Sequence, residues 1–308
     1  MRRIDHRDPF PDELRGAVLA LGNFDGFHLG HQRVVAEATA WARSENRPTI
    51  VATFDPHPVR HFAPHVPAFR LTTLDQRAEL FAAAGADAML VFHFDDALAN
   101  MPAEGFVADL LADRLGAAAV VTGQDFTFGH GRGGNVELLA REGARCGLAT
   151  RAVGPVEDSG LPVSSSRIRD ALKAGECMEA ARLLTRPFAI RGTVIHGDKR
   201  GRAIGFPTAN MDMGHYLRPR FGIYAVTARV LDTGELLRGA ANLGIRPTFD
   251  PPKELLEPYF FDFAGDLYGR EIEVALHHFL RPEMKFDGLD ALTAQMERDC
   301  EQARALLA

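Results

Sequence analysis

The sequence predicts two domains: an α/β domain with a doubly wound parallel sheet, and then an antiparallel β-barrel with a C-terminal helix. In the first half, apolar strand-like runs alternate with helix-like runs, which indicates a parallel sheet covered by helices. After about residue 186, short β-like runs follow one another between Gly, Pro and Asp turns, a spacing typical of a barrel. We therefore predict domains 1–186 and 187–308.

Composition narrows the class of protein. A length of 308 residues suffices for two cores, and 46% hydrophobic with 25% charged residues is typical of a soluble globular chain. A formal charge of -6 argues against nucleic-acid or anionic-lipid partners. The N-terminus lacks a signal-peptide apolar run, and no stretch reaches the roughly 18 apolar residues of a membrane helix. Three scattered cysteines favour free thiols in a reducing compartment. We expect a cytoplasmic protein without a membrane partner.

The elements of the first domain follow from periodicity and from helix signals. The predicted strands are 18–21, 49–54, 88–94, 118–122 and 149–153. The predicted helices are 32–44, one that starts with a capping box of Thr73 and Gln76 and stops at Gly85, 102–115 and 136–146.

Three polar loops follow three of these strands. Their sequences are GNFDGFHLGH at 22–31, DPHP at 55–58 and GQDFTFGHGRGG at 123–134. In an open parallel sheet, ligands bind outside the carboxyl ends of the strands, so we expect these loops to form one cleft.

The first of these loops carries the strongest signal for chemistry. A strand, a glycine turn and a helix start point free N–H groups at an anion. His28 and His31 are three residues apart, so they share a helix face and can share a ligand. HxGH alone is weak evidence, since a pair of core or surface histidines is commoner, but its position after this strand raises its weight. We predict a triphosphate site in which imidazoles stabilise charge at the α-phosphorus.

A serine run opens a further predicted helix with the sequence SSSRIR at 164–169. Its hydroxyls, free N–H groups and two arginines suit phosphate. An N-cap followed by a solvated basic face explains the same pattern, and the motif alone does not decide between the two.

The predicted strands of the second domain are 188–196, 223–231, 236–242, 257–263 and 271–280, with a helix at 289–307. The densest polar loop is HGDKRGRAIGFPTAN at 196–210. Its glycines permit close backbone approach, and its cations suit phosphate, although a solvated hairpin turn is the alternative. It is not a Walker loop, because GxxxxGK[ST] is absent.

Two further sets of residues are candidates in this domain. Thr208 and Asn210 offer oxygen ligands for a Mg²⁺–nucleotide complex, with turn capping as the alternative. Glu257, at the start of an apolar predicted strand, suits a general base for an alcohol. An ordinary strand-end glutamate is the alternative for Glu257, and Glu254 is a rival for the role.

Taken together, these segments resemble the bacterial bifunctional riboflavin kinase/FAD synthetase family over essentially the whole chain. The first half is similar to HxGH nucleotidylyltransferases in GNFDGxHxGH, TFDPHP, GxDFxFGxxRxG and SSSRIR. The second half is similar to riboflavin kinases in HGDKRGRAIGFPTAN, GIYAV, NLGIRPTF and ELLE…DLYG…LRPEMKF. The resemblance implies a Rossmann-like FMN adenylyltransferase domain and a riboflavin kinase barrel.

The resemblance also implies roles for residues. His28 and His31 would bind the ATP phosphates and stabilise the transition state of adenylyl transfer. The surrounding ATP and FMN site would comprise Gly22, Asn23, Phe24, Asp25, Gly123, Asp125, Ser165, Ser166 and Arg167. In the kinase domain, Thr208 and Asn210 would hold Mg²⁺–ATP, and Glu257 would be the catalytic base. The surrounding ATP and flavin site would comprise Gly197, Lys199, Gly201, Arg202, Gly205 and Pro207.

The implied reactions are phosphorylation of riboflavin by ATP to FMN, then adenylylation of FMN to FAD with release of pyrophosphate. Riboflavin, FMN, FAD and ATP would be the small-molecule partners and Mg²⁺ the cofactor. The oligomeric state, including transient self-association, is left open.

Two alternatives stand beside this interpretation. In the first, only one half is active, or the first half adenylylates another phosphorylated substrate. In the second, the chain is a regulatory protein that binds flavin or nucleotide with degenerate sites. The second alternative predicts that residues with an assigned chemical role have been replaced. The five such residues are all present: His28, His31, Thr208, Asn210 and Glu257.

Overall fold

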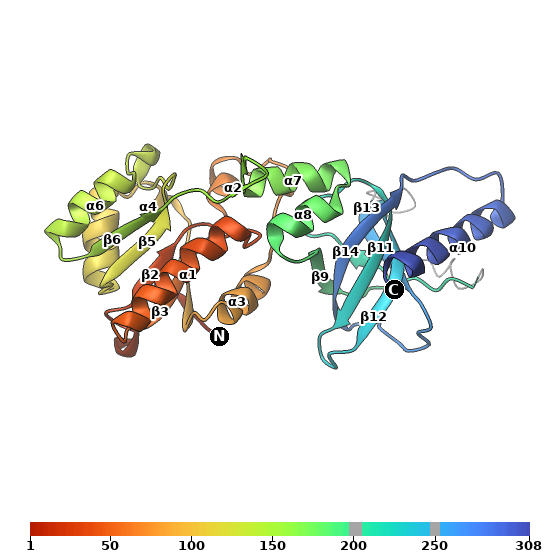
Figure 1. Ribbon diagram of the computed structural model, residues 1–308, viewed down its shortest axis with the longest axis horizontal. Helices are drawn as coiled ribbons and strands as arrows, with labels where there is room; N and C mark the ends of the chain where they lie inside the picture. Colours follow the sequence, from red (N-terminus) through yellow and green to blue (C-terminus); the bar gives the residue numbers. More distant parts are fainter. Residues whose placement is uncertain (197–204, 247–252) are drawn as a thin grey trace. The chain divides into compact units, whose positions relative to one another are not determined.

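The structure is a computed structural model that describes residues 1–196, 205–246 and 253–308 (Figure 1). The backbone forms two compact units. The first comprises Met1–Val66 and Thr73–Ser164, and the second comprises Pro67–Thr72 and Ser165–Ala308. This division concerns packing alone, so the domain boundary at residues 186 and 187 stays a prediction.

The first unit is built on a six-stranded sheet in the order β1-β4-β3-β2-β5-β6. All five neighbouring pairs are parallel. The strands are β1 (Arg2–Asp5), β2 (Val18–Leu21), β3 (Thr49–Asp55), β4 (Ala88–His93), β5 (Ala119–Gly123) and β6 (Ala149–Val153). The doubly wound parallel sheet predicted from the sequence is confirmed.

Side chains alternate between two cores, one on each face of this sheet. Val18 and Ala20 pack in a cluster with residues of α1 (Leu29–Ser44) and α3 (Leu74–Ala83). Leu19 and Leu21 pack in the other cluster, with residues of the π-helical η2 (Phe106–Arg114) and of α6 (Val136–Arg145). Four consecutive buried residues in β2 are therefore explained by helices on both sides.

The remaining short elements of this unit join the strands and helices. They are η1 (Asp12–Leu14), α2 (Pro58–Phe62), α4 (Asp96–Ala99), α5 (Ala103–Gly105), η3 (His130–Arg132), β7 (Glu157–Asp158) and β8 (Leu161–Pro162).

Three elements differ from the sequence-based expectation. The edge strand β1 was not predicted, because only Ile4 of its four residues is buried and no apolar run marks it. The helix predicted at 102–115 is a turn of α5 followed by η2, whose wider turns include a bond from the Leu115 N–H to the Leu110 carbonyl. Helix α1 starts at Leu29 rather than residue 32, because His28 caps it.

The second unit contains an antiparallel sheet in the order β10-β13-β12-β11-β14-β9. Its strands are β9 (Phe188–Thr193), β10 (Met211–Asp212), β11 (Gly222–Val230), β12 (Leu236–Arg246), β13 (Lys253–Phe260) and β14 (Glu271–Arg281). An antiparallel bridge between Ile195 and Asn210 links the extensions of the two edge strands, so the barrel nearly closes. The predicted antiparallel barrel is confirmed.

Strands β12 and β13 are longer toward their connection than predicted. Their ladder runs from Gly239 opposite Phe260 to Arg246 opposite Lys253. Gly244 lies inside β12, beyond the end predicted for this strand at residue 242. Glycine suits this position because a Cβ there would lie 2.2 Å from Glu283 Oε1. Glu257 therefore lies in the middle of β13, not at its start.

Helices cover parts of the barrel. Helices α7 (Ser165–Ala174) and α8 (Cys177–Leu184) belong to this unit, and α8 packs on β14 and β9. The predicted C-terminal helix is confirmed as α10 (Leu289–Leu306), which lies along β11 and β12 (Figure 1). None of the helices in the described ranges is long and apolar enough to cross a bilayer.

The first unit is interrupted by a short excursion of the chain, Pro67–Thr72, which packs within the second unit. There the Arg70 N–H donates to the His215 carbonyl at 3.2 Å, and the Leu217 N–H donates to the Arg70 carbonyl at 2.8 Å. The chain then returns directly into α3, whose Thr73–Gln76 capping box forms as predicted.

A buried ion pair attaches α10 to the barrel. Arg281 Nη2 lies 2.7 Å from Asp299 Oδ2, and the two side chains are 16% and 6% exposed. Arg281 Nε and Gln295 Nε2 each donate to Asp299 Oδ1 at 2.9 Å. Removing one charge of such a pair leaves the other buried without compensation.

We expect Asp299→Asn to lower the free energy of unfolding by about 3 kcal/mol, measured by urea denaturation of the transition that includes the barrel. The matched control is Asp262→Asn, because Asp262 also pairs with α10, through Arg304, but both side chains are exposed. An exposed pair contributes little, so the control should unfold like the parent. Equal losses in both variants would contradict the assignment.

Candidate functional site

The order of strands in the first unit defines where a ligand can bind. Strand β2 lies between β3 and β5, and the direction in which successive strands are added reverses there. Open α/β sheets bind ligands in the crevice at such a switch point, outside the carboxyl ends. The loops after β2, β3 and β5 leave this one edge, since the three strands are neighbours and parallel.

The turn after β2 has a demanding backbone. Phe24, Gly26 and Phe27 have φ of 50°, 87° and 48°, all in the left-handed region. Two of these residues carry large side chains, and such conformations persist only where the surroundings enforce them. Phe24 is 1% exposed and Phe27 is 3% exposed, so burial of the rings enforces the turn.

The two histidines of HxGH form one unit at the start of α1. Their rings are stacked with centroids 3.7 Å apart. His28 is the N-cap, and its Nδ1 accepts a hydrogen bond from the His31 N–H at 3.4 Å. A Cβ on Gly30 would lie 3.1 Å from the His28 ring, closer than most Cβ contacts, so the glycine between the histidines leaves the ring the space it occupies in this stack. The pair lies where the helix dipole favours an anion.

The other predicted residues of this unit lie on the loops after β2 and β5. Asp25 is 2% exposed in the turn after β2, whereas Asp125 is exposed in the loop after β5. Gly123 ends β5, and a Cβ there would lie 2.9 Å from Asp125 Oδ1. Gly22 and Asn23 begin the turn that continues β2.

The serine run spans the boundary between the units, with Ser164 in the first and the next two serines in the second. Ser165, Ser166 and Arg167 form the first turn of α7. Arg167 Nη2 is 2.6 Å from Glu179 Oε1 of α8, so this arginine already has a carboxylate partner. These three residues belong to the second compact unit, and their role at a phosphate stays a prediction.

Sequence reasoning missed an exposed aromatic ledge after β3. Phe62 on α2 is 69% exposed, and its ring lies 5.8 Å from that of Phe94 and 5.1 Å from that of His61. Phe94 directly follows β4, the neighbour of β3. A large exposed aromatic residue beside a ligand edge is a signal for a planar ligand. The signal in the sequence was the presence of phenylalanines, Phe62 and Phe94, soon after the ends of β3 and β4.

In the second unit, the candidates Asn210 and Glu257 form a row across neighbouring strands with Asn242, which was not a candidate. Asn242 of β12 lies opposite Glu257 of β13. Met211 of β10 lies opposite Leu256, and the Ala209 N–H donates to the Pro258 carbonyl at 2.9 Å.

Continuing this register places Asn210 opposite Glu257 on the other side. Directly opposed residues in antiparallel strands share a face, so Asn210, Glu257 and Asn242 face the same way.

The surroundings of this row distinguish the two glutamates. Glu254 lies an odd number of residues from Glu257, hence on the opposite face of β13, and Arg218 Nε donates to Glu254 Oε2 at 2.6 Å. Asn242 Nδ2 donates to Glu283 Oε1 at 3.2 Å. Glu257 is therefore the glutamate that shares a face with Asn210, whereas Glu254 is engaged elsewhere.

Thr208 and Asn210 flank the buried Ala209. Thr208 and Asn210 are two residues apart, the spacing at which side chains share a face of an extended segment. Oxygen ligands of this kind fit Mg²⁺, which is usually held by few protein groups together with substrate phosphates. In the part of the chain that the structure describes, no three His, Cys, Asp or Glu side chains gather as a metal cluster.

The remaining predicted residues of this loop lie partly outside the described ranges. Gly205 and Pro207 are exposed immediately before Thr208. Gly197, Lys199, Gly201 and Arg202 lie outside the described residues.

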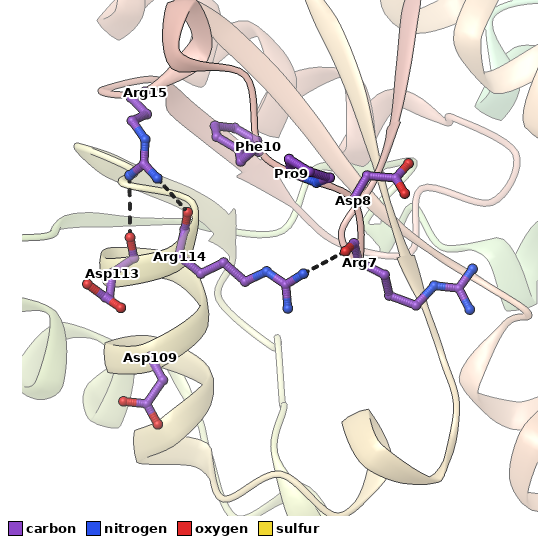
Figure 2. Close-up of a pocket in the computed structure, with 8 residues that line it drawn as sticks. All are labelled: Arg7, Asp8, Pro9, Phe10, Arg15, Asp109, Asp113 and Arg114. Carbon is purple, nitrogen blue, oxygen red and sulfur yellow. Dashed lines mark hydrogen bonds between the residues drawn. The ribbon is translucent and has the colours of Figure 1, made fainter.

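A hollow of about 860 Å³ lies elsewhere in the first unit (Figure 2). Its lining contains none of the predicted residues and comprises Arg7, Asp8, Pro9, Phe10, Arg15, Asp109, Asp113 and Arg114. Arg15 donates to the carbonyls of Asp113 and Arg114, and Arg114 donates to the Arg7 carbonyl. These two arginines thus donate hydrogen bonds to backbone carbonyl groups at the carboxyl end of η2 and in a neighbouring loop.

A parallel sheet with HxGH at its switch point, joined to an antiparallel barrel in which Asn210 and Glu257 share a face, is the arrangement expected of a nucleotide-dependent transferase with two catalytic units. Comparisons with known proteins agree. Residues 10–167 match the FAD synthetase family model, and residues 184–307 match the riboflavin kinase model.

Curated relatives cover the whole chain. A bifunctional riboflavin kinase/FMN adenylyltransferase from Escherichia coli K12 is 40% identical, over 99% of this chain and 96% of the relative. One from Bacillus subtilis is 36% identical, over 95% and 93%. A crystal structure from Streptococcus pneumoniae, described as a macrolide-efflux protein, has a TM-score of 0.88 at 31% identity and covers 99% of both chains.

The chain belongs to the bifunctional riboflavin kinase/FMN adenylyltransferase family. It is an enzyme that phosphorylates riboflavin to FMN and adenylylates FMN to FAD, with ATP as the second substrate. Because both family models match, the comparisons favour this interpretation over the alternatives of one active half or of degenerate sites.

The Gly30 geometry gives a test of the histidine stack. We expect Gly30→Ala to lower the rate of FMN adenylylation at least tenfold, because the new methyl group displaces the His28 ring. Riboflavin phosphorylation should be unchanged. The control is Gly105→Ala, where the nearest atom is the movable end of the Asp109 side chain at 3.3 Å. Full adenylylation by Gly30→Ala, measured as FAD formed from supplied FMN, would show that the stacking is dispensable.

Proposed function

We propose that the two reactions are divided between two sets of residues. The histidine pair His28 and His31 serves adenylyl transfer, and Thr208, Asn210 and Glu257 serve phosphorylation. The observation that carries the first assignment is the stacked pair at the switch point of the sheet. The observation that supports the second is the shared face of Asn210 and Glu257.

In adenylyl transfer, a phosphate oxygen of FMN attacks the α-phosphorus of ATP, and the bond to the pyrophosphate leaving group breaks. Negative charge grows on the α-phosphate oxygens as this happens. His28 and His31 donate hydrogen bonds to those oxygens, and the N-terminus of α1 acts in the same direction. Neither imidazole needs to be a nucleophile.

The loops around the pair bind the two substrates. ATP and FMN are held by backbone and side chains of Gly22, Asn23, Phe24, Asp25, Gly123 and Asp125, with phosphate contacts from Ser165, Ser166 and Arg167. The exposed ring of Phe62 contacts the planar flavin ring, since stacking on an aromatic face orients such a ligand.

In phosphorylation, Glu257 takes the proton from the ribityl 5′-hydroxyl of riboflavin. The oxygen then attacks the γ-phosphorus, and ADP leaves. Thr208 and Asn210 would hold Mg²⁺, which neutralises charge on the phosphates when bound. The preceding loop, with Gly197, Lys199, Gly201, Arg202, Gly205 and Pro207, supplies further contacts to ATP and flavin.

The cellular setting follows from the substrates and the composition. We place the enzyme in the cytoplasm, because its three cysteines are free thiols and ATP is a substrate of both reactions. The net charge of -6 supports small molecules rather than nucleic acid as partners.

Product analysis tests the division. With riboflavin, ATP and Mg²⁺, His31→Ala should accumulate FMN without FAD, because only the pair at the switch point is lost. Asn210→Ala should form little FMN from riboflavin but should convert supplied FMN to FAD. His65→Ala changes an exposed histidine outside both sites and serves as the control. If each variant lost both activities while folded, by chromatography of the flavins, the division would be wrong.

A further inference from the structure

An arginine side chain is fully buried beneath the turn that carries the histidine pair. Arg77 lies on α3 and is 2% exposed, which places it among the largest fully buried side chains of the described residues. Arginine is rarely fully buried unless its guanidinium group is paired with hydrogen-bond acceptors. Substrate in the crevice cannot touch a side chain so completely covered, so any effect of Arg77 on the reaction passes through other residues.

The guanidinium of Arg77 holds the first half of the turn. Its Nη1 donates to the Asn23 carbonyl at 3.2 Å and to Thr53 Oγ1 at 2.8 Å. Thr53 Oγ1 in turn donates to the same Asn23 carbonyl at 2.7 Å. One backbone oxygen therefore accepts two hydrogen bonds, and a charged donor strengthens this arrangement. Thr53 is 0% exposed in β3, so the anchor is rigid.

The same helix holds the second half of the turn through an apolar contact. Phe81 lies one turn beyond Arg77 on the same face of α3. Its ring centroid is 5.8 Å from that of Phe24 and 5.1 Å from that of Phe27, the two residues with left-handed backbone. The Phe24 ring also lies edge-on to the His31 ring at 5.2 Å. A continuous set of contacts thus runs from α3 through the turn to His31.

We propose that Arg77, together with Thr53, is a positioning residue for adenylyl transfer. It fixes the Asn23 carbonyl and so keeps the turn in the left-handed conformation that places His31. The proposal rests on the proposed role of the histidine pair. A displacement of about 1 Å in a reacting group can cost roughly a hundredfold in rate. Loss of the anchor is therefore expected to lower kcat rather than to weaken substrate binding.

The test measures kcat and KM for FMN adenylylation on the full chain, with riboflavin phosphorylation as an internal control. Arg77→Met keeps the length of the side chain but removes the donors. We expect kcat to fall roughly a hundredfold, with the KM for ATP changed by less than about threefold. Arg77→Lys keeps one charged donor and should recover about a tenth of the parent kcat. Phosphorylation of riboflavin should keep its rate in both variants.

Thr53→Val is nearly the same shape and removes only the hydroxyl between Arg77 and Asn23. It should lower kcat roughly tenfold, and it carries the test if Arg77→Met does not fold. Leu80→Ala, on the same helix, removes core packing without removing this anchor and is the matched control for lost stability. All assays are run below the unfolding temperature of each variant.

The outcomes separate this proposal from the assignment of the histidines. Arg77→Met and Thr53→Val with parent kcat, while His31→Ala is inactive, would overturn the positioning role alone. Equal loss of kcat in Arg77→Met and Leu80→Ala at equal loss of stability, without recovery in Arg77→Lys, would make Arg77 merely structural. An active His31→Ala would instead overturn the proposed function.

Discussion

The pairing of β2 with β3 on one side and β5 on the other is the constraint on which the first site depends. Two parallel ladders fix the height at which β2 ends, so the turn, the cap at His28 and the start of α1 have one place relative to the neighbouring loops. Buried side chains on both faces prevent β2 from slipping by a residue. The strained turn after β2 persists because the two ladders hold the end of this strand in place.

The barrel solves the same problem with antiparallel pairing. Asn210 directly precedes the short edge strand β10 and bridges to Ile195, and Glu257 lies in the middle of β13. A seam between edge strands needs few ladder bonds, so oxygen ligands can lie next to it without interrupting a long strand. In both units, a carboxylate or an imidazole pair is placed by backbone pairing rather than by loop length.

The fold class and the bounds of β2 could be predicted from the sequence, because strand alternation and glycine turns are local signals. The cap at His28 could not, since its bond to the His31 N–H depends on ring orientation. Glu257 was assigned to a strand start because the register with β12 is not written in local pattern. Arg77 reads as an ordinary helix residue, and only the tertiary structure reveals that it is buried against Asn23.

The excursion of Pro67–Thr72 has a consequence for any attempt to take the enzyme apart. The chain passes between the two units three times, at residues 66–67, 72–73 and 164–165. A fragment that ends at residue 186 keeps Arg70 but loses the backbone groups of His215 and Leu217 with which it pairs. Cutting the chain once at this position therefore removes two backbone hydrogen bonds of the Pro67–Thr72 segment from the first fragment.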